Sequence, residues 1–397
     1  MKKNLSIILS LCMLITLCAC GSSSHLEEGS ETEKNSVSEE MHIALITEYD
    51  DITNQVFDEA VYKACEDYCK DQHIDLNLYS PGEGTTEARK AVVDSAVSEG
   101  YNVIIMDGAV STAALVESAE KYADIKFIGL GITDWDVLAE TLGEKFDYTP
   151  SNWVPSDYYR SDNVYLASYQ EQVSGYLAGY AAAKMGYKKI GFLGAIQSPS
   201  IARYGYGFVQ GINDAAEPES GIEVNYVYAN QLNDDADITK YMRGWFETGT
   251  EVVFSCGGTV YNSVAKAAEE AKCMVIGAVS DQSKTIDKKY GEGRTITSAI
   301  TDYGIILTKA LSSIENGNWA DYAGRIDSYG ISSAEDPNEN ISRLPLKSTQ
   351  WTKTFSEEDY KNLLSHILNG DFLVSGDTSP ESPSGENISV VYLGNIK

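Results

Sequence analysis

Short apolar runs alternate with stretches of helical spacing along the chain from residue 42 onward. The runs have the length of strands and lie at 42–47, 76–79, 103–107, 126–131, 163–168, 189–193, 222–228, 251–256 and 273–279. Helical spacing is clear near 54–71, 86–99 and 113–122. This alternation predicts parallel sheets wound with helices. Because so many strands exceed what one sheet comfortably holds, we expect two doubly wound lobes.

The stretch 165–216 shows the pattern most clearly, as helix, strand, turn and helix. Gly175 and Gly179 lie one turn apart, so we expect their side of the first helix to lie close against a sheet. Ser198 and Pro199 have the order of an N-cap and a first helical residue. The next helix carries apolar side chains on one face: Ile201, Tyr204, Phe208 and Ile212.

This stretch resembles the basic membrane protein family of substrate-binding lipoproteins, which includes purine-nucleoside receptors of ABC importers. The family pattern is LAG in a helix, then a GFxGG strand, then P-x-I-x-x-F-x-x-GF-x-x-G. Its letters correspond here, in order, to 177–179, 191–195, Pro199, Ile201, Tyr204, Gly207, Phe208 and Gly211. The resemblance covers most of the chain from residue 41 to about residue 330.

The resemblance implies an α/β, type I periplasmic-binding-protein fold, in which two doubly wound parallel-sheet lobes close on a three-segment hinge. It places the chain crossings near 165–169, 281–292 and 326–331. We therefore expect lobe I at 41–165 and 292–326, and lobe II at 166–291 and 327–397. The run 137–162 has no strong periodicity and is expected to be an inserted loop.

The first twenty residues have the features of a processing signal. Lys2 and Lys3 precede a mostly apolar run, 5–17, that is too short for a stable membrane span. The run is followed by Cys18, Ala19 and Cys20, which with Leu17 resemble a lipobox, so Cys20 is the predicted lipidation site. The alternative is an ordinary secretory signal at 1–20. The polar run 21–40 predicts a disordered tether.

Composition and motifs argue against several classes of function. The formal charge of −29 argues against nucleic acid as a partner, because phosphate binding needs clustered Lys and Arg. The sequence contains no G-x-S-x-G elbow, no P-loop and no G-x-G-x-x-G after a strand, so we expect neither an enzyme nor a cofactor. The four cysteines beyond the leader lack metal-site spacing, and nothing selects a disulfide pair among Cys65, Cys69, Cys256 and Cys273.

Polar residues at strand ends are the candidate ligand contacts, because ligands of open α/β sheets bind outside the carboxyl ends of the strands. After strand 42–47, Asp50 and Asn54 match the D-x-S-F-N-Q motif of the family, and the Asn amide suits a purine edge. Helix capping is the alternative role for Asp50. After strand 103–107, Asp107 offers an acceptor and Gly108 permits close approach.

The second lobe adds further candidates. Tyr169 and Tyr204 align with family phenylalanines that face the ligand, and two such rings would sandwich a planar heterocycle. A core position is the alternative for Tyr204. Gly257 and Gly258 resemble the family AGGTG turn, whose backbone N–H groups suit a polar ligand edge. Asp281 resembles the end of the family D-x-D-Q motif.

Two departures from the family concern the class of ligand. Val279 replaces the first aspartate of D-x-D-Q, the residue that resembles a ribose contact of nucleoside receptors. Thr301 replaces the lysine that ends the family motif T-S-x-x-K. Because both presumed sugar contacts are missing, we expect a free nucleobase or another planar heterocycle to be preferred over a nucleoside. The alternative is that Ser280, Asp281 or Asp302, which lie close in the sequence, point into the cleft and compensate for the missing contacts.

Together these features predict a substrate-binding protein of an ABC importer, lipid-anchored on the extracytoplasmic face of the cell membrane. It would capture a purine nucleoside, a nucleobase or another small planar solute in the interlobe cleft. It would then deliver the solute to a permease that works with ATPase subunits. The alternative is a ligand-sensing or regulatory lipoprotein of the same fold without a transport role.

Overall fold

The structure, a computed structural model, describes residues 40–47, 56–147, 152–379 and 381–396. The predicted lipidation site, Cys20, and the predicted ligand contacts Asp50 and Asn54 lie outside these residues. None of the helices in the described ranges is long and apolar enough to cross a membrane.

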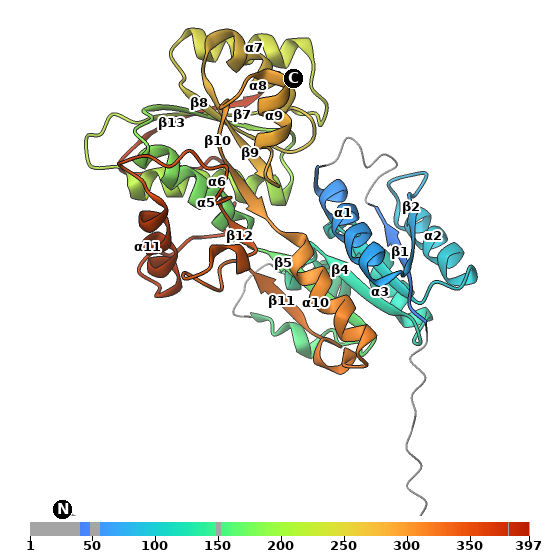
Figure 1. Cartoon of the computed structure of the whole chain (residues 1–397). Helices are drawn as coiled ribbons and strands as arrows, with labels where there is room; N and C mark the ends of the chain where they lie inside the picture. The colour runs from blue at the N-terminus through green and yellow to red at the C-terminus, as the bar shows by residue number, and fades with distance from the viewer. Residues whose placement is uncertain (1–39, 48–55, 148–151, 380, 397) are drawn as a thin grey trace, which may run out of the picture. The chain divides into compact units, whose positions relative to one another are not determined.

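Two sheets organise the chain from residue 40 onward (Figure 1). The first is six-stranded and parallel, in the order β11-β5-β4-β3-β1-β2. Its strands are β1 (His42–Ile46), β2 (Asp75–Tyr79), β3 (Val103–Asp107), β4 (Lys126–Leu130), β5 (Val164–Tyr169) and β11 (Ile326–Tyr329). All five residues of β3 are buried, as expected for a strand covered by helices on both faces.

The second sheet is seven-stranded, in the order β12-β10-β9-β8-β6-β7-β13, and β12 alone runs antiparallel to its neighbour. Its strands are β6 (Lys189–Gly194), β7 (Glu223–Tyr228), β8 (Val252–Cys256), β9 (Met274–Val279), β10 (Thr295–Thr301), β12 (Ser342–Arg343) and β13 (Ser389–Asn395). We call the first sheet with its helices lobe I and the second lobe II.

The helices connect the parallel strands within each sheet. Lobe I contains α1 (Val56–Gln72), α2 (Thr86–Ser98), α3 (Thr112–Lys121), α4 (Asp134–Leu142) and α10 (Tyr303–Glu315), which packs against α1. Lobe II contains α5 (Glu171–Lys184), α6 (Pro199–Ala215), α7 (Ala236–Glu247), α8 (Tyr261–Ala271), α9 (Ser283–Tyr290) and α11 (Glu357–Leu368). The predicted N-cap of α6 is confirmed, because the Ser198 side chain accepts from the N–H of Ile201.

The two glycines of α5 mark its contact with α6. A Cβ added at Gly175 would overlap the backbone oxygen of Tyr204, and one at Gly179 would overlap that of Phe208. The two helices therefore pack backbone to backbone. The small residues do mark a close contact, but its partner is a helix and not the predicted sheet, because α6 lies against the glycine face of α5.

Three connections in the described chain join the two sheets: β5 to α5, β10 to α10, and β11 to β12. The second lies at residues 301–303, later than the expected 281–292, because β10 pairs in parallel with β9 in lobe II. Of the stretch 292–326, expected in lobe I, β10 therefore belongs to the other sheet. The run 137–162 also differs from expectation, since its first residues continue α4, whose start is fixed by a capping box between Thr133 and Asp136.

The cysteines of the described chain are free thiols. Cys65, Cys69 and Cys256 are buried, and Cys273 is partly exposed. Burial raises the pKa of Cys65 and Cys256 well above the usual thiol value. Both are therefore protonated core residues, as is typical of structural cysteines.

Candidate ligand-binding site

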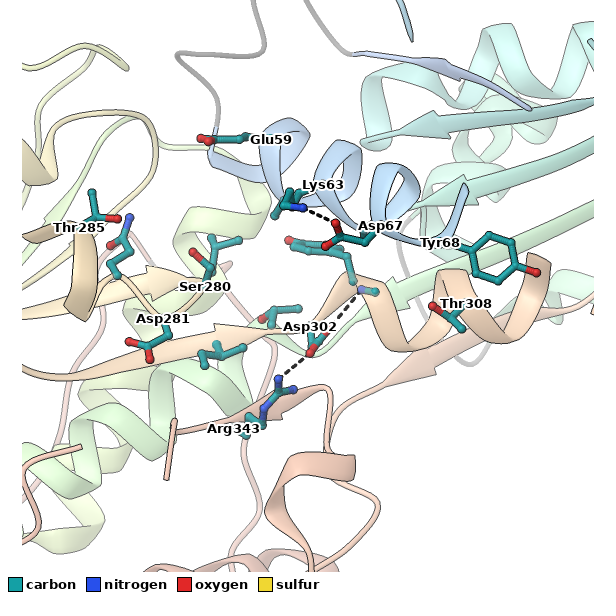
Figure 2. A pocket seen from close by; sticks show the side chains of 18 of the residues that line it. Glu59, Lys63, Asp67, Tyr68, Ser280, Asp281, Thr285, Asp302, Thr308 and Arg343 are labelled. Carbon is teal, nitrogen blue, oxygen red and sulfur yellow. Dashed lines mark hydrogen bonds and ion pairs between the residues drawn. The ribbon is translucent and has the colours of Figure 1, made fainter. Parts of the chain in front are cut away.

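A cavity of about 740 Å³, which we call the first cavity, lies at the carboxyl ends of β9 and β10 (Figure 2). One side is formed by α1 and the first turns of α10. The other side is formed by Val279–Gln282, Ile300–Asp302 and Arg343. Its volume is within the range of small-molecule sites, and its position fits the rule for ligands of open α/β sheets.

Val279 lies at the end of β9 in the wall of this cavity. Its φ is 68°, in the left-handed region, and 1% of its surface is exposed. A β-branched residue is strained in this conformation, and such strain is concentrated at functional sites. The wall here is apolar, where the family motif has a carboxylate.

Thr301 ends β10 and takes part in a buried chain of hydroxyl groups. Tyr204 donates to Thr301 Oγ1 at 2.5 Å, and Ser174 donates to the backbone oxygen of Ile300 at 2.8 Å. Thr301 and Ser174 are 2.9 Å apart, oxygen to oxygen. Because Ser174 has one proton, Thr301 must donate to it. The Thr301 proton is therefore engaged within the protein, and only a lone pair remains for a ligand.

Asp302 and Arg343 form an ion pair where two of the connections between the lobes meet. Asp302 also accepts from the N–H of Gly304 at 2.9 Å, and so caps the start of α10 (Figure 2). The two side chains are 28% and 15% exposed. A partly buried, hydrogen-bonded pair of this kind fixes the geometry of the cavity floor.

Asp281 is the predicted contact that lies in the first cavity. Its carboxylate accepts from Ser348 Oγ at 2.7 Å and from the N–H of Ser283 at 3.1 Å. These bonds hold an exposed acceptor at the start of α9, available to a ring N–H or an amino group of a ligand.

Asp107, Gly108 and Tyr169 lie deeper in lobe I, outside the lining of the first cavity. Asp107 ends β3, is 5% exposed and accepts from the N–H of Gly108 at 3.0 Å. Gly108 has a φ of 77°, a conformation that favours glycine.

Tyr169 is 3% exposed and packs edge-on against Tyr303, with ring centroids 4.5 Å apart. Burial, reinforced by the nearby Asp107 carboxylate, raises its pKa well above the usual value. Its hydroxyl is buried and has no hydrogen-bond partner among the described residues. Because buried hydroxyls are normally satisfied, this group is a candidate for a ligand contact.

Tyr204 is in the core, which is the alternative position considered for it. It is fully buried, packs edge-on against Phe254 at 6.2 Å, and reaches the first cavity through Thr301. Tyr204 lies on the apolar face of α6, and this position explains its burial better than the alignment with a ligand-facing phenylalanine of the family does.

Gly257 and Gly258 have positive φ values of 97° and 49°. A Cβ at Gly258 would overlap the backbone oxygen of Leu232, and the N–H of Thr259 donates to that oxygen at 2.7 Å. The glycines are therefore required by a turn that packs on the loop after β7. They lie outside the lining of the first cavity.

Among the residues of the first cavity that the sequence predictions lack are Tyr68, Tyr303 and Arg343. Tyr303 lies two residues after the end of β10, so the strand-end rule that selected Asp107 also applies to it. Tyr68 faces α10, where its hydroxyl donates to Glu315 at 2.8 Å. Arg343 lies beyond the region of family resemblance, and no local pattern indicates it.

Carboxylates outnumber the basic groups around the first cavity. Glu59, Asp67, Asp71, Asp281 and Asp302 line it, with Lys63 and Arg343. Both basic side chains are paired, Lys63 with Asp67 and Arg343 with Asp302 (Figure 2). The free acceptors suit a ligand with N–H donors. Within the described ranges, no group of three or more His, Cys, Asp or Glu side chains is arranged to hold a metal ion.

Comparison with known proteins identifies the family. Residues 42–334 match the family model Bmp, described as ABC transporter substrate-binding protein PnrA-like. The chain belongs to this family. The ABC transporter nucleoside-binding protein BmpA of Lactococcus lactis is 25% identical over 346 residues, which cover 83% of this chain and 90% of that protein. The CD4+ T-cell-stimulating antigen of Listeria monocytogenes is 24% identical over 417 residues, covering 96% of this chain and all (100%) of the antigen.

The fold comparison agrees with this membership. An ABC transporter solute-binding protein from Conexibacter woesei has a TM-score of 0.61 at 17% identity, over 85% of this chain and 99% of that chain. The predicted type I periplasmic-binding-protein fold is thus confirmed. This Bmp-family protein is a substrate-binding protein of an ABC transporter and not an enzyme, and proteins of this kind bind a small molecule and an ABC permease.

Proposed function

We propose that this Bmp-family protein captures a planar, purine-type solute and prefers a free nucleobase to a nucleoside. The observation that carries the proposal is the pair of strand ends in the first cavity, where Val279 is apolar and the Thr301 proton is engaged. A ribose hydroxyl buried against Val279 would lose its bonds to water without replacing them.

The polar groups around the site support a heterocycle with N–H donors. Asp281 offers an acceptor in the first cavity, and Asp107 offers one near the unpartnered hydroxyl of Tyr169. Asn54, which lies outside the described residues, would add an amide for the purine edge. The Lactococcus relative is named as a nucleoside-binding protein, and a nucleoside contains a planar base of the kind proposed here.

We also propose that a lipid on Cys20 anchors the protein at the extracytoplasmic face of the membrane. The tether 21–40 would keep the lobes near a permease without fixing their orientation. The permease and its ATPase subunits would then receive the solute that the lobes release.

Calorimetric titration of ligand-stripped protein tests the choice of ligand. Adenosine, guanosine and inosine are each compared with the corresponding free base. We expect at least one base to bind, and to bind no more weakly than its nucleoside. Submicromolar binding of a nucleoside at least about tenfold tighter than its base, a gap of about 1.4 kcal/mol, would overturn the preference. Absence of binding by all six compounds would overturn the purine assignment itself.

A further inference from the structure

A second cavity, of about 790 Å³, lies where α4 begins, beside β5 and β11. It shares no lining residue with the first cavity. Its volume is within the range of small-molecule sites. Tyr169 is the one residue of its lining that the purine proposal above also uses.

Segments far apart in the chain form its walls. They are the start of α4, the β5–α5 connection, Arg203 of α6, strand β11 and the loop 376–379. The loop lies outside the part of the chain that matches the family model. It is held in place by Gln210, whose amide exchanges two hydrogen bonds of 2.9 Å with the backbone of Ser375. A reciprocal pair of this kind resembles a rung of a β-ladder and orders the loop at the cavity.

Arg203 supplies a positioned donor. Its Nε and Nη2 donate to the Glu171 carboxylate at 2.7 and 3.2 Å. The Glu171 side chain is 3% exposed and the Arg203 side chain is 20% exposed. The buried carboxylate therefore fixes the inner edge of the guanidinium. Nη1 has no hydrogen bond to any described residue, which leaves donors for a ligand.

Trp135 supplies an aromatic face. Its ring packs on Phe146 at 5.4 Å between centroids, and Phe146 packs on Trp153 at 6.0 Å. Phe146 and Trp153 therefore support the indole. Asp134, Asp327 and Asp377 add acceptors to the same lining.

We propose that the second cavity is a separate binding site for a neutral, polyhydroxylated molecule of monosaccharide size. Vicinal hydroxyls donate to carboxylates and accept from a guanidinium, and the C–H face of a sugar ring packs on an indole. An anion would meet three carboxylates in this lining. A simple ammonium would leave Arg203 Nη1 unused.

Calorimetric titration tests the site with D-glucose, D-galactose, D-mannose, D-ribose, D-xylose and myo-inositol as probes. We expect at least one of them to bind at 1:1 stoichiometry with a Kd below about 1 mM, near −4 kcal/mol. Trp135→Ala should weaken that binding at least tenfold, whereas Trp135→Phe, which retains a ring, should retain most of it. Tyr158→Ala is the matched control, because Tyr158 is an exposed ring of the same run that does not line the cavity.

A second variant guards against misfolding of Trp135→Ala. Asp377→Asn changes an exposed acceptor in the clamped loop and should weaken the sugar without changing the melting temperature. Trp135→Ala and Asp377→Asn should both bind purines as the unmodified protein does. The titrations with purines and with sugars therefore test the two proposals independently. The second site is disproved if none of the six probes binds with a Kd below about 1 mM, or if neither variant weakens the binding of the probe that does.

Discussion

At the scale of single residues, the ends of β9 and β10 decide what the first cavity can recognise. Val279 adopts a left-handed backbone that aspartate, asparagine and glycine adopt more readily than a β-branched residue. Thr301 has its proton engaged by Ser174. The apolar wall and the lone acceptor are therefore properties of two side chains, and each can be changed by substitution.

Val279→Asp should shift the ligand preference from the free nucleobase toward the nucleoside. The aspartate relieves backbone strain and places a carboxylate in the wall, where a ribose hydroxyl can donate to it. We expect the nucleoside-to-base affinity ratio to rise at least about tenfold, or about 1.4 kcal/mol, in paired titrations. Val279→Ala keeps the wall apolar and should leave the ratio unchanged. An equal gain for base and nucleoside would mean that ribose does not reach this wall.

Tyr169→Phe should show whether the Tyr169 hydroxyl contacts the ligand or has only a structural role. The lost hydroxyl has no partner among the described residues, so the free energy of unfolding should stay constant or rise. Purine affinity should fall by about 0.5–1.5 kcal/mol if the hydroxyl bonds the ligand, and Tyr169→Ala should cost about 1–3 kcal/mol through lost stacking. Unchanged affinity in both variants would assign Tyr169 to the core.

Tyr204→Phe should show the opposite behaviour. It removes the proton that Thr301 accepts, in a fully buried place, and should lower the free energy of unfolding by about 0.5–1.5 kcal/mol. Because the Tyr204 side chain is fully buried and its hydroxyl is bonded to Thr301, purine affinity should change by less than about twofold, a difference of about 0.4 kcal/mol. A large loss of purine affinity with an unchanged free energy of unfolding would instead indicate that the Tyr204 ring stacks on the ligand. Chemical denaturation and calorimetry supply both measurements.

At the scale of elements, the contact between α5 and α6 positions much of lobe II. The two helices approach so closely that added Cβ atoms would overlap backbone oxygens. This contact places Ser174 of α5 and Tyr204 of α6 beside Thr301 of β10. The hydroxyl chain therefore depends on helix packing as well as on the residues in it.

Gly179→Ala should destabilise the protein by about 1–3 kcal/mol, because the new methyl group would overlap the backbone of Phe208. Gly244→Ala is the matched control in α7, where nothing lies within 4 Å of the added Cβ. That change should stabilise the helix by about 0.5–1 kcal/mol. Urea denaturation measures both, and similar effects at the two sites would argue against the close α5–α6 packing.

At the scale of the whole molecule, three connections join two lobes, and the ends of the strands in both contribute candidate contacts. The formal charge of −29 agrees with a protein that does not bind nucleic acid, and the described helices do not cross a membrane. The proposal that a lipid on Cys20 anchors the protein depends on the sequence of the leader alone.

Cys20→Ala should leave the protein unlipidated and shed into the medium or mislocalised. Fractionation of cells, followed by immunoblotting, would find the unmodified protein in the membrane and the variant outside it. Cys18→Ala is the matched control and should behave as the unmodified protein. Normal membrane fractionation of Cys20→Ala would contradict lipidation at this residue.

Local patterns in the sequence determined the α/β class, the positions of the main strands, the N-cap at Ser198 and the presence of a close contact at Gly175 and Gly179, although not its partner, which is α6 and not a sheet. These depend on periodicity, capping and side-chain size, which act over a few neighbouring residues. Motif spacing also identified the family and selected Val279 and Asp281, both of which line the first cavity in the structure.

Only the tertiary structure decided which sheet β10 joins, because parallel pairing depends on a strand that is distant in the chain. It also decided that Arg343 pairs with Asp302, that the Tyr169 hydroxyl is without a described partner, and that Tyr204 lies in the core. The second cavity has no signature in the sequence, since its walls come from segments far apart in the chain. Burial and partners of this kind follow from long-range packing, which local sequence patterns do not encode.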